Sequence, residues 1–110
     1  MQELELKCFQ IISAAGVAKS DFIEAISQIK NGDISRATEL VKEGEKSYVQ
    51  GHDAHTELLA LKDAAESINS MVLVMHAEDQ LMAAELYKTL FMEFKSVYGK
   101  LSELEKEVGK

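Results

Sequence analysis

The segment MVLVMHAEDQLMAAELYKTLFMEFKSVY, residues 71–98, decides the fold. Its apolar residues recur at spacings of three and four, which is the period of an α-helix. Residues 66–70 are predicted to be a connection, and we expect the helix to begin after an N-cap at Ser70 and to run over residues 71–107. Such a helix is about 55 Å long, whereas a compact chain of this size has a radius of gyration of only about 13 Å. The sequence therefore predicts an elongated helical bundle.

Two further helices are expected, over residues 3–30 and 33–65. Gly32 can take the left-handed conformation that ends a helix, and the carboxylate of Asp33 can cap the next one. The fold class is therefore predicted to be all-α, a three-helix antiparallel bundle. In the first helix the apolar residues with helical spacing are Leu4, Cys8, Ile11, Ile12, Ala15, Ala18, Phe22, Ile26 and Ile29.

The second predicted helix carries two glycines on its apolar face, Gly44 and Gly51. Each glycine weakens a helix by about 1 kcal/mol relative to Ala. We therefore expect close helix packing at these positions, or fraying. The other residues assigned to this face are Ile34, Ala37, Val41, Tyr48, His52, His55 and Leu59.

The composition is typical of one soluble domain, residues 1–110. Hydrophobic residues make up 46% of the chain and charged residues 28%, which is enough apolar material for a core. A net charge of −7 argues against nucleic acid or an anionic membrane as the main partner. The single cysteine excludes an intrachain disulfide and fits a reducing compartment. With no signal peptide and no membrane-spanning apolar run in view, we expect a cytoplasmic protein.

One acidic residue, Asp79, interrupts the apolar stripe of the third predicted helix. Burying a lone carboxylate costs several kcal/mol unless a cation or metal compensates it. His76 lies one helical turn earlier, at the edge of the same stripe. This pattern leaves open that Asp79 pairs with a lysine and that His76 is a half-buried core residue. The stripe consists of Val72, Met75, Met82, Leu86, Leu90 and Val97, all within about 60° of Asp79 on a helical wheel.

All three histidines, His52, His55 and His76, are predicted to lie on inward faces. Such a concentration suggests a histidine-centred reaction or a metal site, although no pair on one helix has the spacing of zinc ligands. Cys8 is most simply a small core residue. The chain contains no phosphate-binding loop, dinucleotide fingerprint or serine-hydrolase motif, so nucleotide binding and hydrolase chemistry have no support.

Four short stretches share their order and spacing with one known family. Residues 74–82, VMHAEDQLM, resemble the signature V-H-[AG]-Q-D-H-L-M of the IIA component of the bacterial phosphotransferase system, lactose/cellobiose family. Residues 15–20, AGVAKS, resemble the family's A-G-x-A-R-S, and residues 31–33, NGD, resemble its N-G-D-F turn. Residues 52–56, HDAHT, resemble its H-x-x-Q-T. Together these stretches span most of the chain.

The resemblance implies a phosphohistidine carrier that assembles as a homotrimer. His76 stands where the family accepts a phosphoryl group from the phosphocarrier HPr. The group then passes to a cysteine of a IIB component, for uptake of a lactose-, cellobiose- or chitobiose-type sugar, and the membrane is involved only indirectly, through the IIC permease. Neutral imidazole is a nucleophile near neutral pH, so this transferase needs no ATP site.

The resemblance also implies a metal on the trimer axis. Asp79 stands at the position of the family's axial, metal-binding aspartate. Three such carboxylates repel one another strongly in a low-dielectric interior. A divalent cation, expected to be magnesium, would neutralise them through oxygen ligands. The stripe around Asp79 would then be the seam of the trimer.

Three residues depart from the family pattern. Gln80 replaces the second histidine of the signature, Glu78 replaces its glutamine, and His55 replaces the glutamine of H-x-x-Q-T. Gln80 can hydrogen-bond a phosphoryl group but supplies no positive charge, and His55 could replace the missing imidazole from another helix. The candidates for stabilising the phosphoryl group are therefore Gln80, His55 and His52.

Two other functions remain open from the sequence. A His-phosphotransfer domain of two-component signalling is also helical, but such domains usually carry Lys and Gly shortly after the histidine, whereas His76 is followed by Ala-Glu-Asp-Gln. A non-catalytic helical oligomer or adaptor is compatible with the acidic Glu78 and with Gln80 in place of a histidine.

Overall fold

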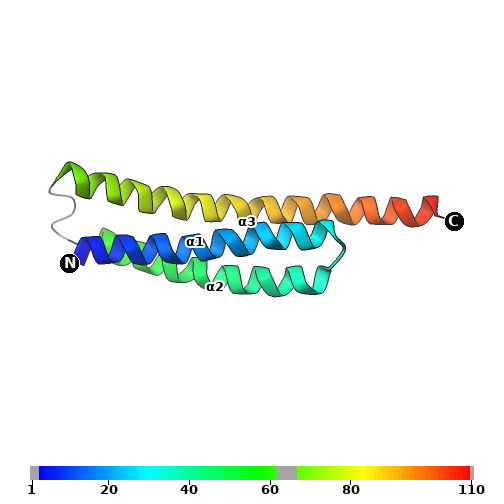
Figure 1. Cartoon of the computed structure of the whole chain (residues 1–110), viewed down its shortest axis with the longest axis horizontal. Helices are drawn as coiled ribbons and strands as arrows, with labels where there is room; N and C mark the ends of the chain where they lie inside the picture. The colour runs from blue at the N-terminus through cyan, green and yellow to red at the C-terminus, as the bar shows by residue number, and fades with distance from the viewer. Residues whose placement is uncertain (1–2, 62–66, 110) are drawn as a thin grey trace.

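The chain folds into three helices, as Figure 1 shows for the computed structural model. The structure describes residues 3–61 and 67–109. Helix α1 spans Glu3–Lys30, α2 spans Ile34–Leu59 and α3 spans Ile68–Val108, and the described residues contain no strand. Because α2 runs back along α1 and α3 returns in the direction of α1, the predicted antiparallel three-helix bundle is confirmed.

The turn between α1 and α2 forms as the sequence predicts. Gly32 has a φ of 86°, in the left-handed region of backbone conformation that residues with a Cβ rarely adopt. The Gly32 N–H donates to the carbonyl of Ile29 at 3.1 Å, which satisfies one of the free carbonyls at the end of α1. The carboxylate of Asp33 accepts from the backbone N–H of Arg36 at 3.0 Å and so caps α2.

The second connection differs from the prediction. Helix α2 ends at Leu59 rather than at residue 65, and the Ala60 N–H donates to the Glu57 carbonyl in the last turn. Helix α3 begins at Ile68, because its N-cap is Ser67 rather than Ser70. The Ser67 hydroxyl accepts from the Ser70 N–H at 3.1 Å, which places Ser70 inside the first turn. The part of the predicted helix end and connection that falls on residues 62–66 lies outside the described residues.

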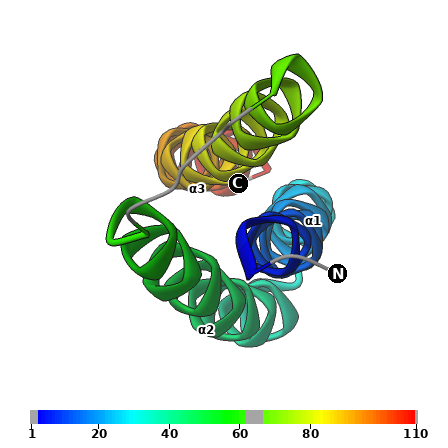
Figure 2. The same ribbon diagram turned by 90° about the vertical axis from the view of Figure 1, so that its left-hand side faces the viewer.

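Helix α1 contributes more buried residues to the core than either of the other helices. It packs against both α2 and α3 along its length, whereas α2 and α3 touch at few points (Figure 2). Both glycines of the α2 face are sites of close packing, as predicted. A Cβ at Gly44 would lie 2.7 Å from Cε1 of the Phe22 ring, and one at Gly51 would lie 3.2 Å from Cδ1 of Leu81. Small residues of α2 thus let the helices approach closely.

The molecule is elongated because α3 is longer than its partners. The Cα atoms have a radius of gyration of 17.9 Å and extents of 66 × 21 × 17 Å, and the C-terminal part of α3 projects past the turn that joins α1 to α2 (Figure 1). Among the described residues, no helix is long and apolar enough to cross a membrane.

Candidate functional site

His76 lies on α3 with an exposed side chain. The prediction that all three histidines point inward is wrong for His76 and for His52, which is also exposed. The reason is that the core face of α3 is not the Val/Met/Leu stripe. The buried residues of α3 lie on the opposite side of the helix and are Ala77, Leu81, Ala84 and Phe91. A histidine next to Ala77 therefore lies on the flank of the helix, where its side chain is exposed.

Asp79 is exposed at the middle of an uncovered apolar surface. Leu86, nine residues after the buried Ala77, lies about 180° from it around the helix. The stripe around Asp79 therefore faces away from α1 and α2. We call these residues the outer stripe; their side chains are 51–68% exposed, and they comprise Val72, Met75, Met82, Leu86 and Val97. Within one chain nothing covers this face of the described structure.

His55 binds Glu78 across the narrow contact between α2 and α3. The Nε2 atom of His55 lies 2.9 Å from Oε2 of Glu78, and the two side chains are 22% and 41% exposed. Two further polar contacts join the same helices farther along, from Tyr48 to Glu85 at 3.4 Å and from Lys88 to Glu45 at 3.3 Å. Three polar side-chain pairs thus join this flank of α3 to α2, in addition to the packing of Leu81 against Gly51.

Burial and acidic neighbours shift two nearby groups. Burial raises the pKa of the Cys8 thiol, and the charges of Glu78 and Glu5 raise it further. Cys8 is fully buried, as expected of a core residue, and the raised pKa keeps it in the unreactive thiol form. Burial also raises the pKa of Tyr48, with Glu85 adding to the effect. Glu78 and Glu85, both on α3, therefore place negative charge near these two groups.

The structure does not bring all the predicted phosphoryl-stabilising residues together in one chain. Gln80 is half-buried one turn after His76, on the same side of α3. His55 contacts Glu78, which lies about 200° from His76 around the helix. The ring of His52 lies beside the Tyr48 ring of its own helix, with centroids 6.3 Å apart and ring planes tilted by 40°. Only Gln80 shares the flank of His76.

No complete metal site exists within one described chain. Among residues 3–61 and 67–109, no group of three or more His, Cys, Asp or Glu side chains could hold a metal ion. Asp79 offers a single exposed carboxylate. Hard divalent cations prefer several oxygen ligands, so Asp79 fits such an ion only if other copies of the chain supply further carboxylates.

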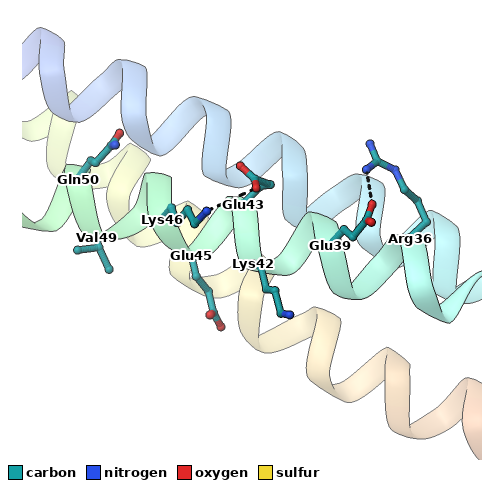
Figure 3. Close-up of a pocket in the computed structure, with 8 residues that line it drawn as sticks. All are labelled: Arg36, Glu39, Lys42, Glu43, Glu45, Lys46, Val49 and Gln50. Atoms are coloured by element: carbon teal, nitrogen blue, oxygen red, sulfur yellow. Dashed lines mark hydrogen bonds and ion pairs between the residues drawn. The ribbon is translucent and has the colours of Figure 1, made fainter.

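A hollow on the outer surface of α2 carries no comparable chemistry (Figure 3). Three acidic and three basic side chains line it, and two pairs neutralise each other, Arg36 with Glu39 at 3.0 Å and Lys46 with Glu43 at 3.8 Å. The balance gives no preference for a ligand of either charge. Its lining is Arg36, Glu39, Lys42, Glu43, Glu45, Lys46, Val49 and Gln50.

Comparison with known proteins identifies the family. Residues 6–99 match the model of the PTS system, Lactose/Cellobiose specific IIA subunit. The chain belongs to this family. The match includes His76, Asp79 and the His55–Glu78 pair. Membership in the IIA family makes the chain a component of a sugar phosphotransferase system, and the resemblance found in the sequence is confirmed.

Several curated relatives agree over nearly their whole length. The PTS system lactose-specific EIIA component of Staphylococcus aureus is 35% identical over 97 residues, which cover 88% of this chain and 94% of that protein. The component of the same name from Streptococcus mutans is also 35% identical, covering 88% and 93%. That of Lactococcus lactis is 32% identical, covering 88% and 92%. No solved structure gives a significant match.

Sequence reasoning about the IIA site missed one contact, the His55–Glu78 pair. Both residues depart from the family pattern in the sequence, but their pairing is visible only in the structure. The available signal was chemical: glutamine is replaced at both positions by residues of complementary hydrogen-bonding character, an imidazole and a carboxylate. The helix crossing that brings them together could not be read from the sequence.

Proposed function

We propose that the chain is a phosphohistidine carrier that accepts a phosphoryl group on His76 from HPr and passes it to a cysteine of a IIB component. The exposure of His76 on α3, inside the family match, carries this proposal. A carrier must present its histidine to two protein partners in turn, and an exposed side chain on a helix meets that need. The sugar served is proposed to be of the lactose, cellobiose or chitobiose type.

The phosphoryl transfer requires few catalytic residues of the chain itself. A bond forms between a ring nitrogen of His76 and phosphorus as the bond between phosphorus and the donor breaks. In the second step a phosphorus–sulfur bond to the acceptor cysteine forms as the nitrogen–phosphorus bond breaks. Gln80 lies one turn away and can donate a side-chain N–H to a phosphoryl oxygen. Positioning and charge stabilisation supply most of the catalysis in such reactions.

The proposed carrier is a homotrimer whose seam is the outer stripe. Exposed apolar residues run along α3, and covering them would remove a large hydrophobic surface from water. Three copies of Asp79 would then meet on the axis, where a divalent cation, proposed to be magnesium, would offset their repulsion. The cation would supply charge neutralisation at the axis.

Labelling of His76 tests the proposed function. The protein is incubated with phosphoenolpyruvate and the general phosphotransferase proteins, and the modified residue is located by mass spectrometry. We expect an acid-labile phosphoryl group on His76 and its absence in His76→Ala. Label that persists in His76→Ala rejects the proposal. A wild-type trimer that never acquires phosphate would identify the chain instead as an adaptor, the function compatible with Glu78 and Gln80.

A further inference from the structure

The two flanks of α3 differ in what they present. One flank carries Glu78, held by His55 of α2, and the other carries the exposed His76. Residues 76 and 78 are separated by about 200° around the helix but by only about 3 Å along its axis. The two groups therefore lie at nearly the same height, with the outer stripe between them on the side that faces away from the core.

Threefold symmetry brings these flanks together. When three parallel copies of α3 meet through the outer stripe, one flank of each helix faces the opposite flank of the next copy. Symmetry keeps equal residue numbers at equal heights, so His76 of one copy is level with the His55–Glu78 pair of its neighbour. The same residues in one chain remain on opposite sides of α3.

The negative charge of Glu78 affects phosphoryl transfer if Glu78 lies beside the His76 of the neighbouring copy. A phosphoryl group on His76 carries close to two negative charges, and a free carboxylate beside it would oppose its arrival. The 2.9 Å contact with His55 holds the Glu78 carboxylate toward α2. We propose that His55 is a positioning residue acting between copies: it restrains Glu78 at the His76 of the neighbouring copy and keeps the phosphoryl position clear.

This inference rests on the proposed function, because it requires the trimer and a phosphoryl group on His76. It goes further by assigning a task to the two departures from the family pattern that meet in one contact. A chain with Gln at both positions has no carboxylate to restrain. Glu78 introduces a carboxylate, and in this chain His55 compensates for it by holding it toward α2.

A second substitution, at Glu78, tests whether His55→Ala slows phosphoryl acceptance by freeing the Glu78 carboxylate or by disturbing the structure. We expect His55→Ala to slow phosphoryl acceptance from the phosphorylated HPr by about five- to tenfold at low salt, as expected for a free carboxylate several ångströms from a dianion. The defect should shrink as salt is added. Adding Glu78→Gln to His55→Ala should restore the rate, because the repelling charge is gone.

A matched control addresses α2–α3 contacts in general. Lys88→Met removes another ion pair between the same helices, the one with Glu45, and should leave the rate unchanged. If His55→Ala acts only by loosening α2 from α3, Glu78→Gln will not rescue it. That result, or a His55→Ala rate equal to the wild-type rate, overturns the inference.

Mixed oligomers test whether His55 acts within a copy or between copies. Chains with His76→Ala and chains with His55→Ala are co-expressed with different tags, and oligomers carrying both tags are purified. Every intact His76 then sits on a chain that lacks His55. We expect a phase of phosphoryl acceptance at the wild-type rate, from His76 residues that face a neighbour with an intact His55.

The outcome also distinguishes the two levels of the proposal. A mixture that reacts only at the slow rate of His55→Ala overturns the assignment between copies. Failure of the wild-type protein to accept phosphate on His76 would instead reject the proposed function, before any variant is compared.

Discussion

At the scale of single residues, Gly44 shows packing prevailing over helix propensity. Alanine is favoured over glycine in a helix by about 1 kcal/mol, but a Cβ here would meet the Phe22 ring at 2.7, 3.0 and 3.1 Å. Phe22 is fully buried, so its ring has no room to withdraw. We expect Gly44→Ala to lower the free energy of unfolding by about 1–3 kcal/mol, measured by urea denaturation at a fixed protein concentration.

Gly99 supplies the control for this substitution. It lies in α3, and a Cβ added there meets nothing within 4 Å. Gly99→Ala should therefore stabilise the protein by about 0.5–1 kcal/mol, the ordinary gain in propensity. Equal effects at the two glycines would contradict the close packing at Gly44.

Residue identity predicted local features but not the direction of every side chain. The glycines of α2 predicted a close approach between helices, and Gly32 and Asp33 predicted the turn between α1 and α2. Each of these residues has a specific use in backbone conformation or packing. His76 was placed on the wrong face, because a helical wheel shows which residues share a side without showing which side meets the core. The Ala77 side proved to be the buried one.

At the scale of helices, the packing of α1 against α2 raises the pKa of one carboxyl group, that of Asp21. Burial raises the pKa of Asp21 above its ordinary value of 3.8, Glu43 raises it further, and Arg36 offsets part of the rise. A raised pKa means that the folded state binds the proton more tightly than the unfolded state. The stabilising contribution of Asp21 is therefore present in acid, below pH 3.8, and is lost as the pH rises through the raised pKa.

Asp21→Asn should then be more stable than the wild type at pH 7, with the advantage shrinking as the pH falls toward 3.8. Urea unfolding at several pH values measures the difference. Asp53→Asn, at an exposed position of α2, controls for the change in net charge. An advantage of Asp21→Asn that is the same at every pH would contradict this account.

Helix number and the first connection were predictable, whereas the second connection was not. The three- and four-residue spacing extends through all of α1, and a left-handed glycine followed by a cap leaves little freedom for the chain. Between α2 and α3, both Ser67 and Ser70 are of a residue type that caps helices. In the structure Ser67 is the N-cap, and its hydroxyl accepts a hydrogen bond from the backbone N–H of Ser70. Spacing alone could not choose between them.

At the scale of the whole molecule, the outer stripe is the feature that a single chain does not explain. The sequence predicted the stripe, and resemblance to the family predicted a seam; the structure leaves the stripe uncovered in one chain. An apolar face looks the same in a sequence whether its own chain or another copy buries it. The choice depends on which helix faces are occupied in three dimensions, and here Ala77 and Leu81 occupy the core side.

A charged substitution in the outer stripe tests its proposed burial between copies. Leu86 is 56% exposed in one chain, and burying such a side chain contributes about 1.5–3 kcal/mol. We expect Leu86→Lys to convert the proposed trimer to monomers while helix content persists, as measured by analytical ultracentrifugation and circular dichroism. Val49→Lys makes the same kind of change on the outer surface of α2 (Figure 3) and should leave the assembly intact. Dissociation by both variants, or by neither, contradicts the seam.

Asp79 distinguishes a seam that binds a cation from one that is merely apolar. If three Asp79 carboxylates meet on the axis, Asp79→Leu removes their repulsion and completes an apolar stripe. Replacing buried charges with packed apolar groups is often neutral or stabilising, so we expect the trimer to persist or to tighten while it loses its divalent cation. Sedimentation measures the assembly, and titration with magnesium measures cation binding. Leu86→Lys gives the opposite result for assembly, so the pair separates the two roles of the stripe. Loss of the trimer in Asp79→Leu with cation binding unchanged would mean that Asp79 contributes to assembly from a position off the axis.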